Sequence, residues 1–553
     1  MNNLLKIITS LSLLMLYSYG YSMNKVLELD PIHQLTMDEV YDVAVNNRPI
    51  RLSKQSLENI KKSHEVVKEM ALSNKPVYGL TTGLGWNKDK PVFTEINGRK
   101  FISEELLQLS KKFNISSLRA HASGLGEPLP TRIIRAAMLI RLNNFIRGEA
   151  GVSLDVAKIY EEFLNLGITP IVPSYGSVGE SDITLASHIG LVMIGEWKAE
   201  YKGNIYPASE ILKKTGIKPV ELVGKDFLSI LSNNSITIGE AVLNTLAAEI
   251  FYHQEVRLFA LMLEGLNGNV APFSKEVINL NNFENVKTTS LELTKVLNGS
   301  DLWNYSNERA LQDPLSFRTM IFALSNTYEA IQEAKKALTI QINTSDDNPT
   351  VLLNIEEPTS SQLQSYILNN NDDKLSGIFP TSNFNILSVV IKIETLNIAL
   401  ARLSENMTQQ IIRISDPSLT KLSRFLAAPT NNGHSFGAIE KTFTYSNIRI
   451  KNLALPQSYH TIVVAGNIED TGSMSTISIK NLGHIIHHLY EISAFQILES
   501  TQSLDLRKDF KLSDTTYKIK QNYRKEIPFI SEDQIFTTII EKSIKFVKSI
   551  QIQ

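Results

Sequence analysis

The sequence of 553 residues contains no cysteine. This absence excludes disulfide bonds, thiolate metal sites and a cysteine nucleophile. An excess of charge is also missing, because 55 basic residues stand against 57 acidic ones and the formal net charge is −2. Such a balance gives no electrostatic reason to expect binding to nucleic acid or to an anionic membrane. No run beyond the N-terminus approaches the roughly 18 apolar residues of a membrane span, so we expect a soluble mature protein.

The composition is that of an ordinary globular protein, with 43% hydrophobic and 20% charged residues. The chain is longer than a usual single domain, so we expect two or three substructures around a large core. The N-terminus carries one lysine, an apolar stretch over residues 7–16 and small residues at 18–22. This pattern predicts a signal peptide at 1–22 and a periplasmic or secreted protein. If Met23 is the true start, the protein is cytoplasmic.

Long helices dominate the expected secondary structure. Apolar residues recur every three to four positions, with few prolines or glycines, over residues 236–266, 314–342, 385–414 and 459–501. Such runs predict a mainly α protein built on a long-helix bundle. We expect this bundle at 226–506, after a smaller loop-rich domain at 23–225 that carries the active-site loop. A short helical tail at 507–553 follows.

The most informative stretch is 176–184, which reads Gly-Ser-Val-Gly-Glu-Ser-Asp-Ile-Thr. Two glycines three apart predict a tight exposed loop, because glycine adopts backbone angles that other residues avoid. A second glycine-rich loop at 77–85 has Tyr78 at its base. A tyrosine acts as a base near neutral pH only if its pKa is strongly lowered by nearby positive charge or hydrogen-bond donors. For this loop alone, a hydrogen-bonded core tyrosine is the competing interpretation.

The order of these and later motifs resembles the aromatic amino-acid ammonia-lyase family, which includes histidine, phenylalanine and tyrosine ammonia-lyases and aminomutases. The resemblance covers about residues 36–501. Six motifs of the family resemble stretches of this chain in the same order, some of them with substitutions. In the family's letters, with the matching residue numbers of this chain, they are Tyr-Gly-x-Asn-Thr-Gly-Phe-Gly at 78–85, His-Ala-Ala-Gly-Val-Gly at 121–126, Gly-Ser-Val-Gly at 176–179, Gln-Asp-x-Tyr-Ser-x-Arg at 312–318, Asp-Asn-Pro at 347–349 and Asn-Gln-Glu-Asp at 467–470. The resemblance implies the bundle fold, a small-molecule amino-acid substrate, and a homotetramer whose active sites each draw residues from three chains.

The family makes its own electrophile, a methylidene-imidazolone, from an Ala-Ser-Gly tripeptide, so the resemblance implies no external cofactor and no metal. Here the corresponding residues are Glu180, Ser181 and Asp182. Without a gap Asp182 takes the place of the glycine, and with one residue deleted it takes the place of the family's following aspartate. In cyclisation the amide nitrogen attacks a carbonyl two residues earlier, an approach that glycine permits and that an aspartate crowds.

The resemblance assigns further roles by position. Tyr78 is the base that takes the β-proton, and Glu469 faces the substrate amine. His121 lies where the family reads the substrate ring and favours a polar ring such as that of histidine or tyrosine. The asparagine that contacts the electrophile falls on Ser232, and Asn233 takes its place after a shift of one residue.

Four other positions match substrate-binding residues of the family. Arg318 binds the substrate carboxylate with its forked guanidinium, and Gln312 and Asn348 accompany it. Phe384 flanks the electrophile. The family's tyrosine three residues before Arg318 is Leu315 here, which removes a hydroxyl group from the pocket.

Three hypotheses follow from the sequence. The first is an exported ammonia-lyase or aminomutase whose electrophile forms from the altered tripeptide and which acts on histidine or tyrosine. The second is a diverged enzyme that uses acid/base chemistry without the electrophile, through Tyr78, Glu180, Asp182 and Glu469. The third is a non-catalytic amino-acid-binding or scaffold protein.

Overall fold

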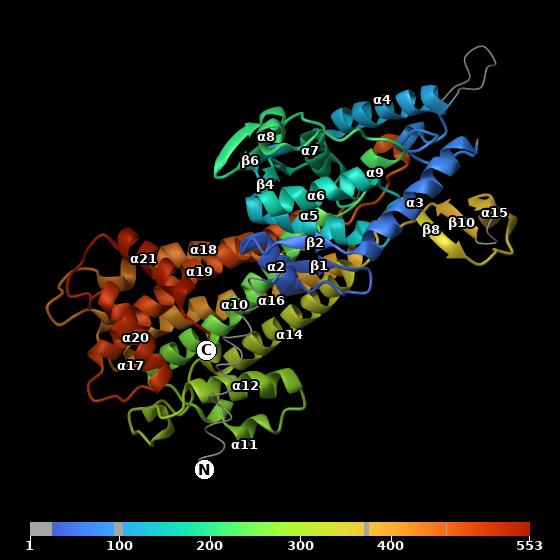
Figure 1. Cartoon of the computed structure of the whole chain (residues 1–553). Coiled ribbons are helices and arrows are strands. Elements are labelled where there is room, and N and C mark those ends of the chain that lie inside the picture. Colours follow the sequence, from blue (N-terminus) through green and yellow to red (C-terminus); the bar gives the residue numbers. More distant parts are fainter. Residues whose placement is uncertain (1–24, 74, 93–102, 370–374, 461, 553) are drawn as a thin grey trace, which may run out of the picture. The chain divides into compact units, whose positions relative to one another are not determined.

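The computed structural model describes residues 25–73, 75–92, 103–369, 375–460 and 462–552 (Figure 1). The predicted signal peptide at 1–22 lies outside this range. The chain forms two compact units. Unit 1 comprises 1–243, 336–390 and 457–477, and unit 2 comprises 244–335, 391–456 and 478–553. The units are not consecutive segments, and the domain boundaries expected from the sequence stay predictions.

Unit 1 combines helices with four small sheets. Its helices are α2 (Met37–Val45), α3 (Lys54–Leu72), α4 (Ser103–His121), α5 (Thr131–Phe145), α6 (Leu154–Leu166), α7 (Ile183–Met193), α8 (Ala208–Thr215), α9 (Asp226–Leu231) and α15 (Ser361–Gln364). Its strands are β1 (Leu27–Leu29), β2 (Ile50–Leu52), β3 (Leu125–Pro128), β4 (Ile168–Pro170), β5 (Pro173–Tyr175), β6 (Lys198–Tyr201), β7 (Asn204–Pro207), β8 (Thr350–Ile355), β9 (Ile367–Asn369) and β10 (Leu375–Phe379). Strands β1 and β2 pair in parallel; the orders β8-β10-β9, β3-β5 and β4-β6-β7 are antiparallel.

Local sequence explains where these helices start and what they bury. The Thr36 side chain accepts a hydrogen bond from the Glu39 amide, and the Glu39 carboxylate accepts one from the Thr36 amide, so a capping box starts α2. Ser53 is the N-cap of α3, and its side chain accepts a hydrogen bond from the Ser56 amide. The apolar face of α3, including Val67 and Met70, packs with Val351 of β8 and Ile378 of β10 in a buried cluster. The sheet and α3 therefore share one core, which fixes the start of the loop that carries Tyr78.

Unit 2 is almost entirely helical. Four long helices pass from one unit into the other: α10 (Ser235–Leu266), α14 (Met320–Gln341), α16 (Leu387–Ile414) and α19 (Ser475–Leu506). The other helices of unit 2 are α11 (Lys275–Ile278), α12 (Glu284–Val296), α13 (Leu315–Arg318), α17 (Pro417–Thr420), α18 (Glu440–Leu453), α20 (Asp514–Glu526) and α21 (Phe536–Ser549). Short 3-10 turns occur at Gly85–Asn87, Ala271–Phe273, Asp301–Trp303, Arg424–Leu426, Ser435–Ala438 and Ala465–Asn467.

The mainly α fold predicted from the sequence is confirmed, and three of the four long runs are helical nearly as expected. The fourth prediction, a helix from 459 to 501, is wrong in its first part, because α19 begins only at Ser475. Ala465, Asn467 and Met474 have positive φ values of 47°, 68° and 50°, which no right-handed helix contains. The segment before α19 is a loop, and part of it lines the pocket described below.

No helix of the described ranges has the length and apolar character needed to cross a membrane. The same ranges contain no group of three or more histidine, aspartate or glutamate side chains that could hold a metal ion.

Candidate active site

Unit 1 contains a cavity of about 810 Å³, lined by seven separate segments of that unit. The segments are the loop at 78–88, the C-terminal half of α4, the loop before α7 with the first residue of α7, helix α9 with Ser232, the turn at Asn348, the loop at 380–384 and the loop at 465–469. Eight of the predicted site residues line this cavity: Tyr78, His121, Glu180, Ser181, Ser232, Asn348, Phe384 and Glu469. The fold thus gathers residues that are almost 400 positions apart in sequence.

The loop at 176–180 is held by the segment just before and at the start of α19. The Ser473 hydroxyl donates to the Gly179 carbonyl at 2.7 Å, and the Met474 amide donates to the Val178 carbonyl at 3.1 Å. Gly179 has φ 93°, and a Cβ atom at this position would lie 2.4 Å from the Ser473 Oγ. Glycine is therefore required at 179 both by the backbone angle and by the close contact.

Ser181 and Asp182 are tied to the segment that precedes α10. Ser181 is buried, and its backbone is in the left-handed conformation with φ 74°. Its amide donates to Asn234 Oδ1 at 3.3 Å. The Asp182 amide donates to the Asn233 carbonyl at 2.7 Å. The Asp182 carboxylate accepts from the Thr237 amide at 2.9 Å and from the Thr237 hydroxyl at 2.6 Å. Asp182 is fully buried and does not line the cavity; it occupies the N-cap position of α7, but its side chain makes no capping hydrogen bond there.

Two carboxylates face the cavity. Glu180 Oε1 accepts from the Ser473 amide at 3.0 Å and from the Asn385 side chain at 3.2 Å. Burial raises the pKa of Glu180 to about 7, the two hydrogen bonds oppose this rise, and the nearby charge of Glu469 adds to it. Within the described residues neither carboxylate forms an ion pair. Among the described residues of unit 1, no lysine or arginine pairs with either carboxylate, although Lys88 also lines the cavity, and two unpaired carboxylates suit a cationic ligand.

Tyr78 lies at the start of the loop 78–88, and its hydroxyl accepts a hydrogen bond from the Gly85 amide at 3.1 Å. Burial raises the pKa of Tyr78, the Gly85 hydrogen bond opposes the rise, and the charge of Glu469 adds to it. The lowered pKa that a base requires is thus not found in this site without its substrate. A cation bound beside the hydroxyl would shift the pKa downward.

His121 closes α4, and its Nδ1 lies 2.7 Å from the Ser117 carbonyl oxygen. Because a carbonyl only accepts, this contact assigns the proton to Nδ1 and leaves Nε2 of the neutral ring as an acceptor. His121 lines the cavity and can accept a hydrogen bond from an N–H or O–H group on a substrate ring.

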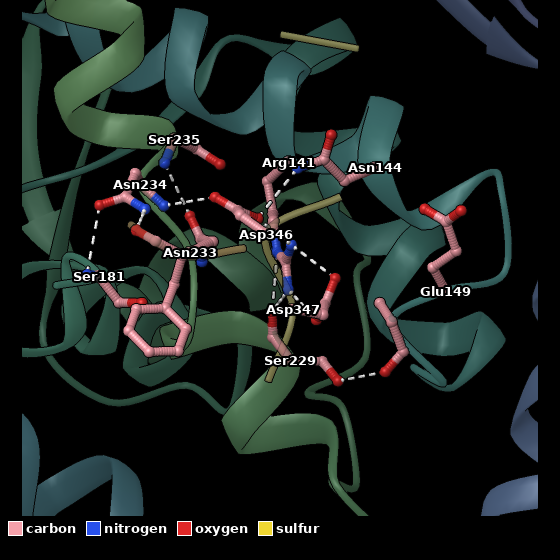
Figure 2. Close-up of polar contacts among 12 residues, drawn as sticks. Arg141, Asn144, Glu149, Ser181, Ser229, Asn233, Asn234, Ser235, Asp346 and Asp347 are labelled. Carbon is pink, nitrogen blue, oxygen red and sulfur yellow. Dashed lines mark hydrogen bonds and ion pairs between the residues drawn. The ribbon is translucent and has the colours of Figure 1, made fainter. Parts of the chain in front are cut away.

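The segment 232–234 corrects one expectation from the sequence. Ser232 lines the cavity, but the Asn233 side chain does not, because it donates to the Ile230 carbonyl at 2.7 Å and accepts from the Ser235 amide at 2.9 Å. The amide side chain that reaches the loop belongs to Asn234, which the sequence analysis missed. Its partners are Ser181 and the Phe384 carbonyl, 2.7 Å from Asn234 Nδ2 (Figure 2).

Gln312 and Arg318 lie in unit 2 and are not among the residues that line the cavity of unit 1. Gln312 is exposed, and Arg318 is half-buried with its Nε donating to the Asp313 carbonyl at 2.8 Å. Leu315, at the position of the family's tyrosine, is exposed. The arginine that the resemblance assigns to the substrate carboxylate is therefore not among the residues of unit 1 that line the cavity.

Other residues of the site were not predicted. Lys88 and Trp86 line the cavity from the loop 78–88, and Lys88 is 2.9 Å from Asp89. A Cβ atom at Gly466 would lie 1.1 Å from the Trp86 ring, so the indole lies directly on this glycine. In the sequence, a tryptophan directly after the glycine-rich loop was a possible signal that Trp86 belongs to the site. Nothing in the sequence pattern signals a contact made by a backbone amide, such as that of Ser473.

Comparisons with known proteins agree with this fold. The family model described as aromatic amino acid lyase matches residues 35–525 of this chain. A histidine ammonia-lyase from Treponema denticola is 31% identical over 519 residues, which cover 93% of this chain and 95% of that protein. The crystal structure of the ergothioneine-degrading enzyme ergothionase from Treponema denticola, in complex with desmethyl-ergothioneine sulfonic acid, has a TM-score of 0.85 at 33% identity, covering 95% of this chain and 99% of that one.

A histidine ammonia-lyase from Trypanosoma cruzi has a TM-score of 0.80 at 20% identity, covering 95% of this chain and 94% of that one, which supports the fold alone. The matched range includes all the segments that line the cavity. The chain therefore belongs to the aromatic amino acid lyase family and is a carbon–nitrogen lyase of the ammonia-lyase type.

Proposed function

We propose that this enzyme eliminates an amine from a histidine-like amino acid without the family's electrophile, and that its preferred substrate carries a quaternary ammonium group, as ergothioneine does. The observation that carries the proposal is the hydrogen bonding of the tripeptide Glu180-Ser181-Asp182. The third residue is Asp182, whose amide is hydrogen-bonded to the Asn233 carbonyl and whose carboxylate is held by Thr237.

The residues present do not fit the self-made electrophile. Cyclisation needs the amide nitrogen of Asp182 to approach the Glu180 carbonyl carbon. That amide instead donates to the Asn233 carbonyl, and the buried Asp182 carboxylate is held by two hydrogen bonds from Thr237. The Glu180 side chain stands where the family has a methyl group, and it is oriented by Ser473 and Asn385. The proposed reaction therefore contains no step that uses the electrophile.

The chemistry of the leaving group explains how the reaction proceeds without it. A base facing an ordinary α-ammonium group takes an N–H proton first, and the neutral amine that remains is a poor leaving group. A quaternary ammonium has no N–H proton, so the base can take only a carbon-bound proton. The β-proton goes to the base, the C–H electron pair forms the Cα=Cβ bond, and the Cα–N pair leaves with nitrogen as a neutral tertiary amine.

The cavity offers groups for these roles. Tyr78 is the proposed base, and the permanent charge of the substrate lowers its pKa when it binds nearby. Glu180 and Glu469 face the cation, and His121 Nε2 accepts a hydrogen bond from the substrate ring. Ergothioneine, a trimethylammonium derivative of a thio-histidine, has the required cation and ring, and ergothionase is named for degrading it.

The test is a direct comparison of substrates on the purified full chain. Ergothioneine and histidine are incubated separately; the conjugated acrylate product is followed by absorbance, and the released amine is identified by proton NMR. We expect trimethylamine from ergothioneine at a rate at least about 100-fold above that of ammonia release from histidine, a difference of about 2.7 kcal/mol in activation free energy. Equal or faster release of ammonia from histidine would contradict the proposal.

We also propose that the site is completed in a homotetramer. Support comes from Arg318, which the resemblance assigns to the site although it belongs to unit 2 and does not line the cavity of unit 1, and from exposed apolar side chains on unit 2 helices, among them Ile391 and Ile398 of α16 and Tyr445 and Ile448 of α18. Light scattering at micromolar concentration tests this; a monomer would contradict it. Export through cleavage near residue 22 is a further proposal, tested by the N-terminal residue of the protein recovered from its source.

A further inference from the structure

Asn234 is a buried residue that does not line the cavity, yet its side chain contacts two of the segments around it, one of them at Ser181 (Figure 2). Its Oδ1 accepts from the Ser181 amide at 3.3 Å, and its Nδ2 donates to the Phe384 carbonyl at 2.7 Å. Its own amide donates to Asp346 Oδ2 at 2.7 Å. All four residues belong to unit 1.

The backbone of Asn234 is fixed by a buried ionic cluster. Asp346 Oδ1 accepts from Arg141 at 3.2 Å and from the Asn144 side chain at 3.2 Å, while its other oxygen holds Asn234. Arg141 forms a second, two-pronged contact with Asp347, at 2.7 and 3.1 Å (Figure 2). Since these side chains are almost fully buried, Asn234 projects from a rigid base.

The two segments that the Asn234 side chain joins are two of the three that position Glu180 in the cavity, the third being the segment with Ser473. One contains Glu180 itself, next to Ser181. The other contains Asn385, which follows Phe384 and donates to Glu180 Oε1. Glu180 and Asn385 also form an isolated antiparallel bridge. A change in the spacing of these segments would therefore move the carboxylate.

Ser181 needs such support. A non-glycine residue in the left-handed region is strained, and it persists only where its surroundings hold it. Its φ of 74° is maintained by the hydrogen bond to Asn234 and by the Ser177 hydroxyl, which donates to the Ser181 carbonyl at 3.1 Å.

We propose that Asn234 is a positioning residue for the elimination reaction, and that its side-chain amide fixes the separation of the 180–182 and 384–385 segments and thereby the placement of the Glu180 carboxylate. Its effect on activity rests on the proposed function, but its effect on the loop does not. The two effects are measured separately.

The experiment compares Asn234→Asp and Asn234→Ser with Asn143→Asp. Asn234→Asp retains the size and the acceptor for the Ser181 amide and removes the donor to Phe384, whereas Asn234→Ser is too short for both contacts. Asn143, on α5, is the matched control. It is equally buried, and it donates to the Ile342 carbonyl at 2.9 Å and to Asn343 at 3.3 Å. Among the described residues its side chain forms no hydrogen bond with the loop at 176–183.

The first readout is amide hydrogen exchange in peptides covering 176–183 and 380–387. We expect exchange to rise by about tenfold in both Asn234 variants, the effect of losing about 1.4 kcal/mol of hydrogen bonding, and to stay unchanged there in Asn143→Asp. Unchanged exchange in both Asn234 variants, or an equal rise in the control, would overturn the proposal. If Asn234→Asp fails to fold, Asn234→Ser provides the same comparison.

The second readout is turnover. A misplaced catalytic group lowers kcat by up to about 100-fold, whereas a merely less stable fold lowers the amount of active enzyme. For both Asn234 variants we expect kcat per folded enzyme to fall at least about tenfold, with KM changed less than about threefold, and no such fall in Asn143→Asp. An unchanged kcat in folded Asn234 variants would overturn the positioning role. If the wild-type chain turns over none of the substrates, the proposed function fails while the exchange comparison still decides the effect on the loop.

Discussion

Two groups of charged side chains in unit 1 differ in how their charge is balanced. In the cluster around Arg141, one guanidinium contacts both Asp346 and Asp347, and Lys225 lies 3.9 Å from Asp347. In the cavity, Glu180 and Glu469 have no ion pair within the described residues. The cluster is complete without a ligand and is structural. The cavity carries a charge that a cationic substrate can neutralise, and this difference separates the supporting region from the reacting one.

The largest expected effect comes from breaking the cluster. Arg141→Met leaves two buried carboxylates without their cation and should lower the free energy of unfolding by about 3–5 kcal/mol. Urea unfolding followed by circular dichroism measures it. The control is Arg119→Met, which removes an exposed pair with Glu196 and should change stability little. Equal effects of the two substitutions would show that the Arg141 cluster is not the support described.

The next effect concerns the cavity. Glu469→Gln retains the shape of the side chain and removes the charge that faces the substrate cation, so kcat/KM should fall by roughly 30- to 1,000-fold, or about 2–4 kcal/mol. The melting temperature should stay nearly constant. Glu65→Gln, on the exposed surface of α3, is the control and should leave kcat/KM unchanged. An unaltered kcat/KM in Glu469→Gln would remove this carboxylate from the site.

A buried acid in unit 2 gives a third type of environment. Glu255 is fully buried on α10, accepts a hydrogen bond from Gln496 at 2.8 Å, and burial raises its pKa to about 8. The unfolded chain loses this proton at lower pH than the folded chain, so Glu255 makes the protein less stable as pH rises from about 4.5 to 8. In Glu255→Gln this loss disappears, and the gain over wild type should grow by at most about 1.4 kcal/mol per pH unit. A constant difference between pH 5 and 8 would contradict it.

The smallest effect is a pH dependence of binding. Since burial raises the pKa of Glu180 to about 7, this carboxylate is neutral below that pH and charged above it. Ergothioneine binding to a Tyr78→Phe variant, in which turnover is blocked, should weaken by about tenfold between pH 7.5 and pH 5.5. Calorimetry measures the affinity. Adding Glu180→Gln should flatten the response, and a response that persists would assign it to another group.

Much of the fold could be predicted from the sequence, because apolar residues at helical spacing mark buried faces whatever they pack against. The bounds expected for α10 and α16 differ from those of the structure by at most two residues. The start of α19 was misplaced because residues 459–474 are apolar enough to suggest a helix. Their backbone instead turns at positive φ values to meet the loop at 176–180.

The site was predictable where a motif carries its own side chain into the cavity, as with Tyr78, Glu180 and Glu469. It was not predictable where the function depends on a neighbour in space. Asn234 lies two residues beyond Ser232, and only the turn before α10 determines which amide reaches Ser181. That Arg318 belongs to unit 2 while the cavity is lined by unit 1 is likewise a property of the folded units, which no local pattern records.

The most direct test of the account is the intact mass of an enzyme preparation that has just been shown to release an amine. Formation of the family's electrophile removes two water molecules from the chain, whereas elimination without it leaves the mass of the polypeptide unchanged. We predict the full mass of the mature polypeptide, together with release of trimethylamine from ergothioneine. An active preparation lighter by two waters would contradict the claim that this enzyme works through its own acidic and phenolic groups.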